Sequence, residues 1–596
     1  MAKKKKSEKI FSRRMKQKLV AVFVILILML FALNVRLSYI NMKNGDKYTI
    51  QVLAQQKYTN KTLAFKRGDI LDRNGVALAT STKRYNLILD PKIILSDEKY
   101  LEATVEALAS CFSYSKEEFT DVIKSKSDSS YVIQLKQLTF EEIKGFQQMQ
   151  SDNASIQGVW FEETYVRQYP YASLAGDVIG FASSSDSGAT GLEAYYNDYL
   201  TGINGREFGY TNTDNFMESV IKEPVDGYNL VSTIDFNIQT IVEKYIAQYK
   251  AEYSPENIAV VIADPDTGEI LAMASDKQSD LNNPRDLAAY YTPEQIAAMT
   301  DEQKVESMNA IWQNYCISSS YEPGSTFKPF TVSAALEESL VTPASTFLCD
   351  GGEWKGGWQI SCWKTSGHGV LDLKGTLEQS CNDSLMQIAV LLGPDKFCKF
   401  QKMFGFGENT GIDLPSEQSS AALLYAAKDM TEADLASNSF GQNFNVSMVQ
   451  MVSAFSSLVN GGNYYQPHVV KQVSDENGNI VENIDKTLVK QTVSPEVSDF
   501  IREALLGVVV EGTGSAAAVA GYQVGGKTGT AEKQPRGQNK YVLSFLGFAP
   551  YDDPQVVCYT LVDSPQVDNP SSSAYASALF SQIMTEVLPY MDIYPQ

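Results

Sequence analysis

A serine and a lysine stand three residues apart in the stretch Tyr321–Phe330, which reads YEPGSTFKPF. On a helix this spacing puts both side chains on one face, so a neutral Lys328 amine can take the Ser325 hydroxyl proton during attack on a carbonyl. A lysine acts as such a base only where burial or a second cation lowers its pKa. Gly324 leaves room beside the serine, and the free N–H groups at a helix start suit an oxyanion.

The Ser-x-x-Lys pattern alone does not identify a nucleophile, because so short a pattern arises often by chance. It occurs at four other places in this chain, Ser96/Lys99, Ser113/Lys116, Ser219/Lys222 and Ser361/Lys364. For each of these the alternative reading is two polar residues on a solvated surface. Ser325 therefore needs support from other motifs.

The triplet Lys527-Thr528-Gly529 occurs once and follows two glycines. Glycines on a strand permit close approach of another backbone or a ligand, and the lysine would supply a cation for an anionic substrate. A lysine on an exposed edge strand is the alternative interpretation.

Two of the Ser-x-Asn triplets in this chain are Ser151-Asp-Asn153 and Ser380-Cys-Asn382. The first precedes Ser325 in a polar stretch, where ordinary turn chemistry explains it. The second interrupts the apolar helical pattern LEQSCNDSLMQIAVLL, where polar groups are costly without partners. We therefore favour Ser380 and Asn382 as the second polar group of a catalytic site.

Other chemistries find less support in the sequence. A Ser-His-Asp triad would need His368 or His468, but neither has a G-x-S-x-G partner, and a structural role is expected for both. The seven cysteines include no C-x-x-C pair, so zinc spacing is lacking and neither a metal nor a cofactor is expected. A disulfide between two of Cys349, Cys362 and Cys381 stays open beside the favoured reading of buried thiols.

The elements that would position these motifs form an α/β domain. The apolar runs 258–263 and 270–274 flank Asp, Pro and Gly residues and predict a hairpin, which marks the start of the domain. Helices are expected over 329–340 and, buried in the core, over 446–458. Further strands are expected over 521–530, 542–548 and 556–562, so that both ends of this sequence build one sheet, flanked by helices.

The N-terminus has the pattern of a membrane anchor. Residues 1–18 carry nine Lys and Arg, and an apolar run follows from Leu19 to Leu33, extending to Ile40. No small-x-small cleavage site follows, which argues against a signal peptide. The flanking charges place the N-terminus in the cytoplasm and the rest of the chain outside the cell membrane, in a single pass. The chain has a net charge of -21 despite this basic block, which disfavours nucleic-acid binding.

The 596 residues exceed what one core holds, and two or three domains are expected. Between the anchor and the hairpin the chain mixes short strand and helix patterns, which predicts an elongated α+β pedestal. The predicted division is a basic tail (1–18), an anchor (19–40), a non-catalytic domain (41–250) and a catalytic domain (251–596).

The order Ser-x-x-Lys, Ser-x-Asn, Lys-Thr-Gly resembles the penicillin-recognising serine transferases. Together with FGFGENTGIDLP, SFGQNFNVSMVQM and GGKTGTAEK, it makes the domain similar to the transpeptidase domain of class B penicillin-binding proteins. The upstream stretches LAFKRGDILDRNG, VRQYPY and GATGLEAYYNDYL resemble the non-catalytic domain of that class. The resemblance implies a structural interdomain role for Arg67, Gly68, Asp72, Arg73, Arg167, Gly191 and Glu193.

By this resemblance Ser325 attacks the D-Ala-D-Ala carbonyl of a peptidoglycan stem peptide, with Lys328 as general base. Ser380 would relay the proton to the departing D-Ala, and Asn382 would position the substrate and Lys328. The resemblance further implies that Lys527 supplies positive charge, that the substrate carboxylate binds Thr528 and Thr530 beside Gly529, and that the N–H groups of Ser325 and Thr530 form the oxyanion hole. β-Lactams would acylate the same serine.

Two alternatives use the same serine: a membrane-anchored β-lactamase and a β-lactam-binding sensor. The anchor and the large extra domain favour synthesis over hydrolysis, and sensors of this kind carry several membrane spans. A bifunctional synthase would need a glycosyltransferase domain, which residues 41–250 do not resemble. Glycan polymerisation is therefore expected from a membrane-bound partner.

Overall fold

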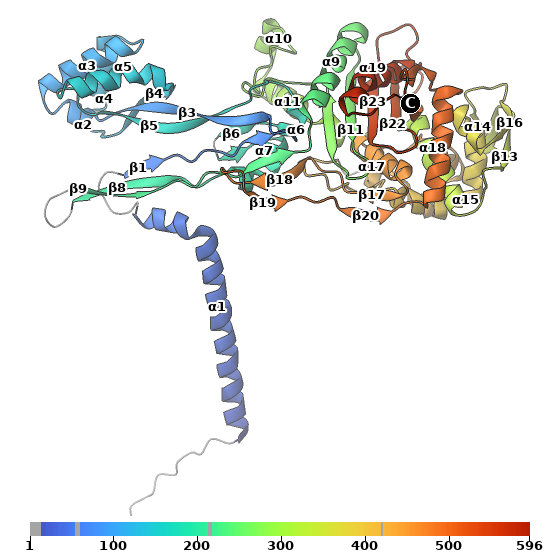
Figure 1. Cartoon of the computed structure of the whole chain (residues 1–596), viewed down its shortest axis with the longest axis horizontal. Coiled ribbons are helices and arrows are strands. Elements are labelled where there is room, and N and C mark those ends of the chain that lie inside the picture. Colours follow the sequence, from blue (N-terminus) through green and yellow to red (C-terminus); the bar gives the residue numbers. More distant parts are fainter. Residues whose placement is uncertain (1–12, 54–59, 185, 212–216, 419–420, 596) are drawn as a thin grey trace, which may run out of the picture. The chain divides into compact units, whose positions relative to one another are not determined.

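The computed structural model describes residues 13–53, 60–184, 186–211, 217–418 and 421–595 (Figure 1). The chain forms two compact units. The first unit comprises Met1–Phe65, Arg84–Thr164 and Ile203–Val225, and the second comprises Lys66–Lys83, Tyr165–Gly202 and Asp226–Gln596. The division at residue 250 stays a prediction, whereas the compact units place 66–83 and 165–202 with the catalytic motifs.

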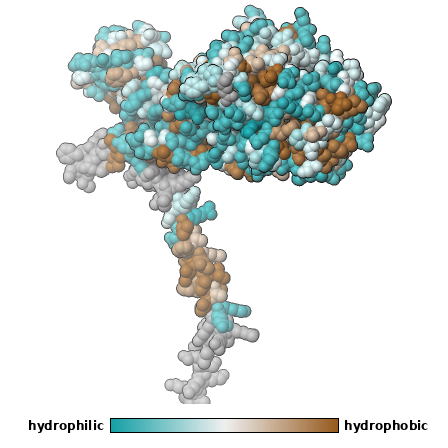
Figure 2. All heavy atoms as spheres, turned by 45° about the vertical axis from the view of Figure 1, so that its right-hand side comes forward, coloured by the Kyte–Doolittle hydropathy of each residue, from teal (hydrophilic) through white to brown (hydrophobic). Residues whose placement is uncertain are grey.

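Helix α1 (Arg13–Leu53) carries the apolar run of the N-terminus. Its stretch Val20–Tyr39 is long and apolar enough to cross a membrane, and none of it is buried against the rest of the chain. Figure 2 shows this stretch as a hydrophobic band with hydrophilic residues at both ends. Because water would be a poor solvent for such a band, it is a candidate membrane span.

The first unit also contains a three-stranded sheet in the order β1-β8-β9 and a helical cluster beside strands β4 and β5. Two of its helices begin with capping boxes, in which Ser115 or Thr139 exchanges hydrogen bonds with a glutamate three residues on. The bounds are β1 (Asn60–Leu63), β8 (Gly205–Thr211), β9 (Met217–Lys222), β4 (Val132–Leu138), β5 (Val159–Gln168), α2 (Pro91–Ile94), α3 (Glu98–Cys111), α4 (Lys116–Ser125) and α5 (Phe140–Asp152).

The second unit is built on a five-stranded antiparallel sheet in the order β12-β11-β23-β22-β21. Its strands are β11 (Asn257–Ala263), β12 (Ile270–Ser275), β21 (Gly525–Glu532), β22 (Tyr541–Ala549) and β23 (Val556–Asp563). The predicted hairpin and the three predicted C-terminal strands are therefore confirmed. Strands from both ends of the catalytic sequence meet where β11 pairs with β23.

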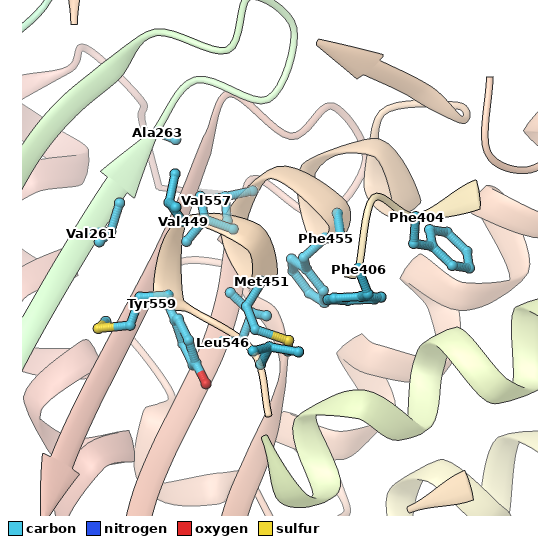
Figure 3. Close-up of a cluster of buried hydrophobic side chains, with 14 of the residues drawn as sticks. Val261, Ala263, Phe404, Phe406, Val449, Met451, Phe455, Leu546, Val557 and Tyr559 are labelled. Carbon is cyan, nitrogen blue, oxygen red and sulfur yellow. The ribbon is translucent and has the colours of Figure 1, made fainter. Parts of the chain in front are cut away.

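Helices cover both faces of this sheet, so its strands are apolar nearly throughout. Helices α9 (Phe236–Tyr253) and α19 (Ala574–Tyr590) pack on one face, and α17 (Met448–Val459) packs on the other. Figure 3 shows Val449, Met451 and Phe455 of α17 beside side chains of β11, β22 and β23. Every residue of α17 is buried, which confirms the predicted core helix.

Helical structure is interrupted at two places in or next to helix α15 (Asn382–Met403), which begins at the last residue of the Ser-x-Asn triplet. Helix α15 contains a non-helical Gly393 before Pro394, and Ser380 lies in the short connection from α14 (Leu373–Glu378) to α15. The predicted helix after Ser325 is α13 (Lys328–Glu337), which follows the 3-10 turn η1 (Gly324–Phe327).

The second unit contains further short helices and strands. The helices are α6 (Gly176–Ile179), α7 (Gly191–Tyr195), α8 (Asn197–Leu200), α10 (Pro293–Ala298), α11 (Asp301–Trp312), α12 (Tyr315–Ser318), α16 (Glu432–Ser439) and α18 (Pro495–Val510), with the short 3-10 turns η2 (Ala421–Leu423), η3 (Ala427–Asp429) and η4 (Ser515–Ala517). The strands are β2 (Ile70–Leu71), the start of β3 (Ala77–Leu89), β6 (Ala182–Ser184), β7 (Ser187–Gly188), β10 (Asn229–Ser232), β13 (Thr346–Cys349), β14 (Gly352–Lys355), β15 (Trp358–Ser361), β16 (Gly369–Asp372), β17 (Asn463–Tyr465), β18 (Val470–Ser474), β19 (Ile480–Asn483) and β20 (Leu488–Gln491).

Candidate active site

Ser325 lies in the turn η1, and Lys328 is the first residue of the helix that follows. The Ser325 side chain is half-buried, whereas Lys328 is fully buried. The turn is tight because Gly324 has a φ of 58°, in the left-handed region, and a Cβ there would lie 2.9 Å from the Thr530 carbonyl oxygen of β21. The candidate nucleophile is thereby held against the strand that carries Lys-Thr-Gly.

The Lys328 ammonium donates to three acceptors, all from the Ser-x-Asn triplet. Nζ lies 2.6 Å from the Ser380 carbonyl oxygen, 3.1 Å from Ser380 Oγ and 2.6 Å from Asn382 Oδ1. These contacts use the three hydrogens that an ammonium offers. The structure thus brings together the first and second motifs, which are far apart in the sequence.

Ser380 also accepts a hydrogen bond from the third motif, since Lys527 Nζ lies 3.0 Å from its Oγ. One hydroxyl is therefore shared by two buried lysines. Ser380 has a φ of 51°, which only a small fraction of residues other than glycine adopt. Such a conformation costs on the order of 1 kcal/mol and persists only where the surroundings enforce it, as at functional sites.

Strand β21 carries the third motif past the turn η1 at very short range. A Cβ on Gly529 would lie 2.3 Å from Ser544 Oγ and 3.0 Å from Thr326 Cγ2, so only glycine fits here. Lys527 is fully buried and donates as well to Thr528 Oγ1 at 3.2 Å. Thr530 follows on the same strand, with its Oγ1 3.3 Å from the Ser571 carbonyl oxygen.

The electrostatics of the two lysines favour loss of a proton. Burial lowers the pKa of Lys328 from its usual value to about 8. Burial also lowers the pKa of Lys527 well below its usual value, and the nearby Lys328 charge lowers it further. A neutral amine is thus accessible near neutral pH beside the candidate nucleophile.

The upstream residues singled out by the resemblance form a buried network in the second unit. Glu193 binds Arg67 Nε at 2.7 Å and Arg167 Nε at 2.6 Å, and both Arg67 and Glu193 are fully buried. Arg167 also donates to the Gly68 carbonyl oxygen at 2.7 Å. All three stretches thereby meet at one carboxylate.

The other members of this set have structural contacts as well. Asp72 accepts from the backbone N–H of Phe236 at 3.1 Å, at the start of α9, and Arg73 binds Glu269 at 3.1 Å. A Cβ on Gly68 would lie 1.8 Å from a backbone oxygen, and Gly191 has a φ of 56°. None of these contacts involves a residue of the three catalytic motifs.

One group of side chains, which includes the middle residue of the Ser-x-Asn triplet, was not predicted as a cluster from the sequence. The ligand atoms of Cys349, Cys362, His368 and Cys381 all lie within 4.8 Å of one another. The three cysteines are buried free thiols, as expected. The carbonyl oxygen of His468, the other histidine, accepts a hydrogen bond from the backbone N–H of Ile270 at 3.0 Å.

A serine at a helix start, a buried lysine one turn later, a Ser-x-Asn hydroxyl between two lysines and a Lys-Thr-Gly edge strand together define a penicillin-recognising serine acyl transferase. Residues 258–585 match the family model described as the penicillin binding protein transpeptidase domain. Residues 62–232 match the model described as the penicillin-binding protein dimerisation domain.

Individual proteins agree with these models. The chain is 33% identical over 593 residues to Stage V sporulation protein D of Bacillus subtilis, covering 98% of this chain and 87% of that protein. It is 27% identical to the probable peptidoglycan D,D-transpeptidase PenA of Neisseria meningitidis, covering 90% and 86%. The crystal structure of penicillin binding protein 2X from Streptococcus thermophilus has the same fold, with a TM-score of 0.73 at 24% identity over 90% of this chain and 81% of that one.

The chain therefore belongs to the class B penicillin-binding proteins, as the motifs indicated. It is a serine D,D-transpeptidase that cross-links peptidoglycan stem peptides and binds β-lactams.

Proposed function

We propose that Ser325 is the nucleophile and that neutral Lys328 is its general base. The Ser325 oxygen attacks the carbonyl of the D-Ala-D-Ala bond while the Lys328 amine takes the hydroxyl proton. The N–H groups of Ser325 and Thr530 stabilise the oxyanion. The observation that carries this proposal is a fully buried lysine, with its pKa lowered to about 8, one helical turn from the serine.

The same proposal assigns the next proton transfer to Ser380. Its Oγ lies 3.1 Å from Lys328 Nζ and 3.0 Å from Lys527 Nζ, so it can pass the proton from Lys328 to the departing D-Ala nitrogen. Asn382 fixes Lys328 through its side-chain oxygen. The amide bond breaks, an ester to Ser325 forms, and D-Ala leaves as a neutral amine.

In the same proposal strand β21 provides the residues that bind the substrate. Lys527 attracts the terminal carboxylate, which hydrogen-bonds to Thr528 and Thr530 beside Gly529. An amine from a neighbouring stem peptide then attacks the ester, which restores the Ser325 hydroxyl and forms the cross-link. A β-lactam acylates the same oxygen, but its ring stays attached and blocks the incoming amine.

Labelling with a fluorescent penicillin tests the assignment. The full-length protein in detergent should become covalently labelled, and Ser325→Ala should not, whereas Ser361→Ala removes a serine from another Ser-x-x-Lys match and should be labelled normally. Labelling of Ser325→Ala would refute the nucleophile. An acyl-enzyme that turns over within seconds would instead favour the β-lactamase alternative.

For the N-terminal residues we propose a single-pass anchor in membrane lipid over residues 19–40, with residues 1–18 in the cytoplasm and the chain from residue 41 onward outside. Nine basic residues on one side of the apolar stretch support this orientation. A reporter enzyme active only outside the cytoplasm should be active when fused after residue 596 and inactive when fused before residue 1.

We also propose that a separate membrane-bound polymerase supplies the glycan strands, because residues 62–232 match a penicillin-binding protein dimerisation domain and no part of the chain resembles a glycosyltransferase. The likeness to Stage V sporulation protein D favours a role in spore formation. Deletion of the gene should then reduce the yield of heat-resistant spores while vegetative growth continues. Slow or filamentous vegetative growth of the mutant would favour elongation or division instead.

A further inference from the structure

Residues 346–372 form a small lobe next to the active site that has almost no apolar core of its own. It consists of the two-stranded pairs β13-β16 and β14-β15 and the connections between them. From residue 350 to residue 372, Cys362 is the one buried side chain, whereas Trp354, Trp358 and Trp363 are more than half exposed. Isolated two-stranded pairs are marginally stable, so another interaction must hold this lobe.

Three thiols and one imidazole occupy the place of that core. Cys349 ends β13, Cys362 follows β15, His368 precedes β16, and Cys381 precedes α15. Three ligating side chains of the lobe thus meet one from the connection between α14 and α15. The odd number of thiols argues against a disulfide as the purpose of the cluster, because one thiol and the imidazole would be left over.

The distances fit a tetrahedral metal site. A zinc ion with Zn–S bonds of about 2.3 Å and Zn–N bonds of about 2.0–2.1 Å separates its sulfur ligands by about 3.8 Å and sulfur from nitrogen by about 3.6 Å. His368 Nδ1 lies 3.4 Å from Cys349 Sγ and 3.7 Å from Cys362 Sγ. Cys362 Sγ lies 3.9 Å from Cys381 Sγ.

Neighbouring groups support the ligands in the manner of an outer coordination shell. Cys381 Sγ accepts from Ser384 N at 3.4 Å and from Ser384 Oγ at 3.3 Å, at the N-terminus of α15. The His368 ring packs against the edge of Trp363, with 5.1 Å between ring centroids. Trp363 in turn donates to the Ser380 carbonyl oxygen at 3.2 Å.

We propose a structural zinc site whose ligands are Cys349, Cys362, His368 and Cys381. Thiolate and imidazole ligands in a closed tetrahedron select Zn²⁺ over Mg²⁺ or Ca²⁺, which prefer oxygen. On binding, each thiol releases one proton and the imidazole coordinates as the neutral base. From the sequence we expected no metal, because the chain has no C-x-x-C pair. The zinc proposal departs from that prediction.

The zinc site acts on catalysis through position rather than chemistry. Cys381 lies between Ser380 and Asn382, the two residues that hold Lys328. Ser380 is in a strained conformation, with a φ of 51°. A metal bond to the adjacent Cys381 fixes the backbone that this conformation requires, so Cys381 is a positioning residue.

Metal analysis of the full-length protein tests the site directly and does not depend on the proposed function. The protein is purified in detergent through a tag that binds no metal, and zinc is measured by mass spectrometry. We expect about one zinc per chain in the wild type, little in Cys362→Ser and His368→Ala, and about one again in His368→Cys, which restores four ligands. Cys398→Ser is the matched control, a buried cysteine outside the cluster, and should keep its zinc.

Cobalt offers a second measurement that does not rely on ligand variants folding. Wild-type protein stripped with a zinc chelator should show a lower midpoint of thermal unfolding, restored by Zn²⁺ but not by Mg²⁺. Added Co²⁺ should give the visible and thiolate charge-transfer absorption of a tetrahedral site. A wild type without zinc after incubation with Zn²⁺, or a Cys362–Cys381 disulfide in most of the isolated protein, would overturn the proposal.

The positioning role has its own readout, which rests on the proposed function. Removal of zinc should slow acylation of Ser325 by fluorescent penicillin by about tenfold or more, because small displacements of catalytic groups are costly. Re-addition of Zn²⁺ should restore the rate. Loss of zinc with an unchanged acylation rate would leave the metal site standing and refute the positioning role of Cys381.

Discussion

The protonation of Lys328 should set the pH dependence of acylation. Its pKa of about 8 means that about one tenth of the molecules hold a neutral Lys328 at pH 7 and about nine tenths at pH 9. In the proposed mechanism the neutral amine is the base, so the acylation rate should rise with pH. The acylation rate should rise about tenfold between pH 7 and pH 9 and should level off above pH 9. An exposed lysine, with a pKa near 10.4, would instead give close to tenfold per pH unit throughout this range.

The assay is the second-order rate constant for acylation of the full-length protein by a fluorescent penicillin from pH 6 to 10. A plateau above pH 9 supports the buried base. A rate that still rises about sevenfold between pH 9 and pH 10 would show that the pKa of Lys328 is not lowered, and a flat profile would show that Lys328 is not the base.

Three further predictions concern packing and charge in the second unit. Gly529→Ala brings a Cβ to 2.3 Å from the Ser544 hydroxyl on β22. It should lower the free energy of unfolding by about 1–3 kcal/mol and slow acylation. The double variant Gly529→Ala/Ser544→Gly should recover part of the stability and part of the acylation rate. Glu193→Gln leaves two arginines without their carboxylate and should lower the free energy of unfolding in urea by about 3–5 kcal/mol; Glu586→Gln, which loses an exposed ion pair, should cost about 1 kcal/mol or less. Burial raises the pKa of Asp177 to about 7, so the folded state binds the extra proton and stability falls as pH rises from about 4 to 7; Asp177→Asn should flatten that part of the thermal unfolding profile, and an unchanged profile would contradict the assignment.

The sequence predicted the parts of the site whose chemistry is carried by short patterns. Ser325 and Lys328 were predicted at the start of a helix and Lys527 on a strand with glycines, and the structure has these elements at those places. The choice of Ser380 over Ser151 rested on burial, since a polar triplet in an apolar pattern needs partners. The two lysines that contact Ser380 are those partners.

Contacts between residues far apart in the sequence could be predicted less well. No two of the four clustered Cys and His residues are closer than six positions in the sequence, so no local spacing signals them. Their meeting depends on the pairing of β13 with β16 and of β14 with β15, which propensity does not specify. The chain passes back and forth between the two units, so that each unit consists of three separate segments. This could not be predicted for the same reason, because strand-like patterns do not say which strands pair.

The triplet Ser380-Cys381-Asn382 shows why a motif with a free middle position can still be constrained there. Its first residue must turn a hydroxyl toward two lysines, and its third must begin a helix and accept from Lys328. Both requirements meet only because Ser380 takes a left-handed conformation, which costs free energy and needs an outside restraint. The middle side chain lies in the thiol cluster, where its sulfur accepts from Ser384 and caps α15. Cys381, without catalytic chemistry of its own, thus lies where it can hold the two neighbours to which we assign such chemistry, and we expect it to be as sensitive to substitution as they are.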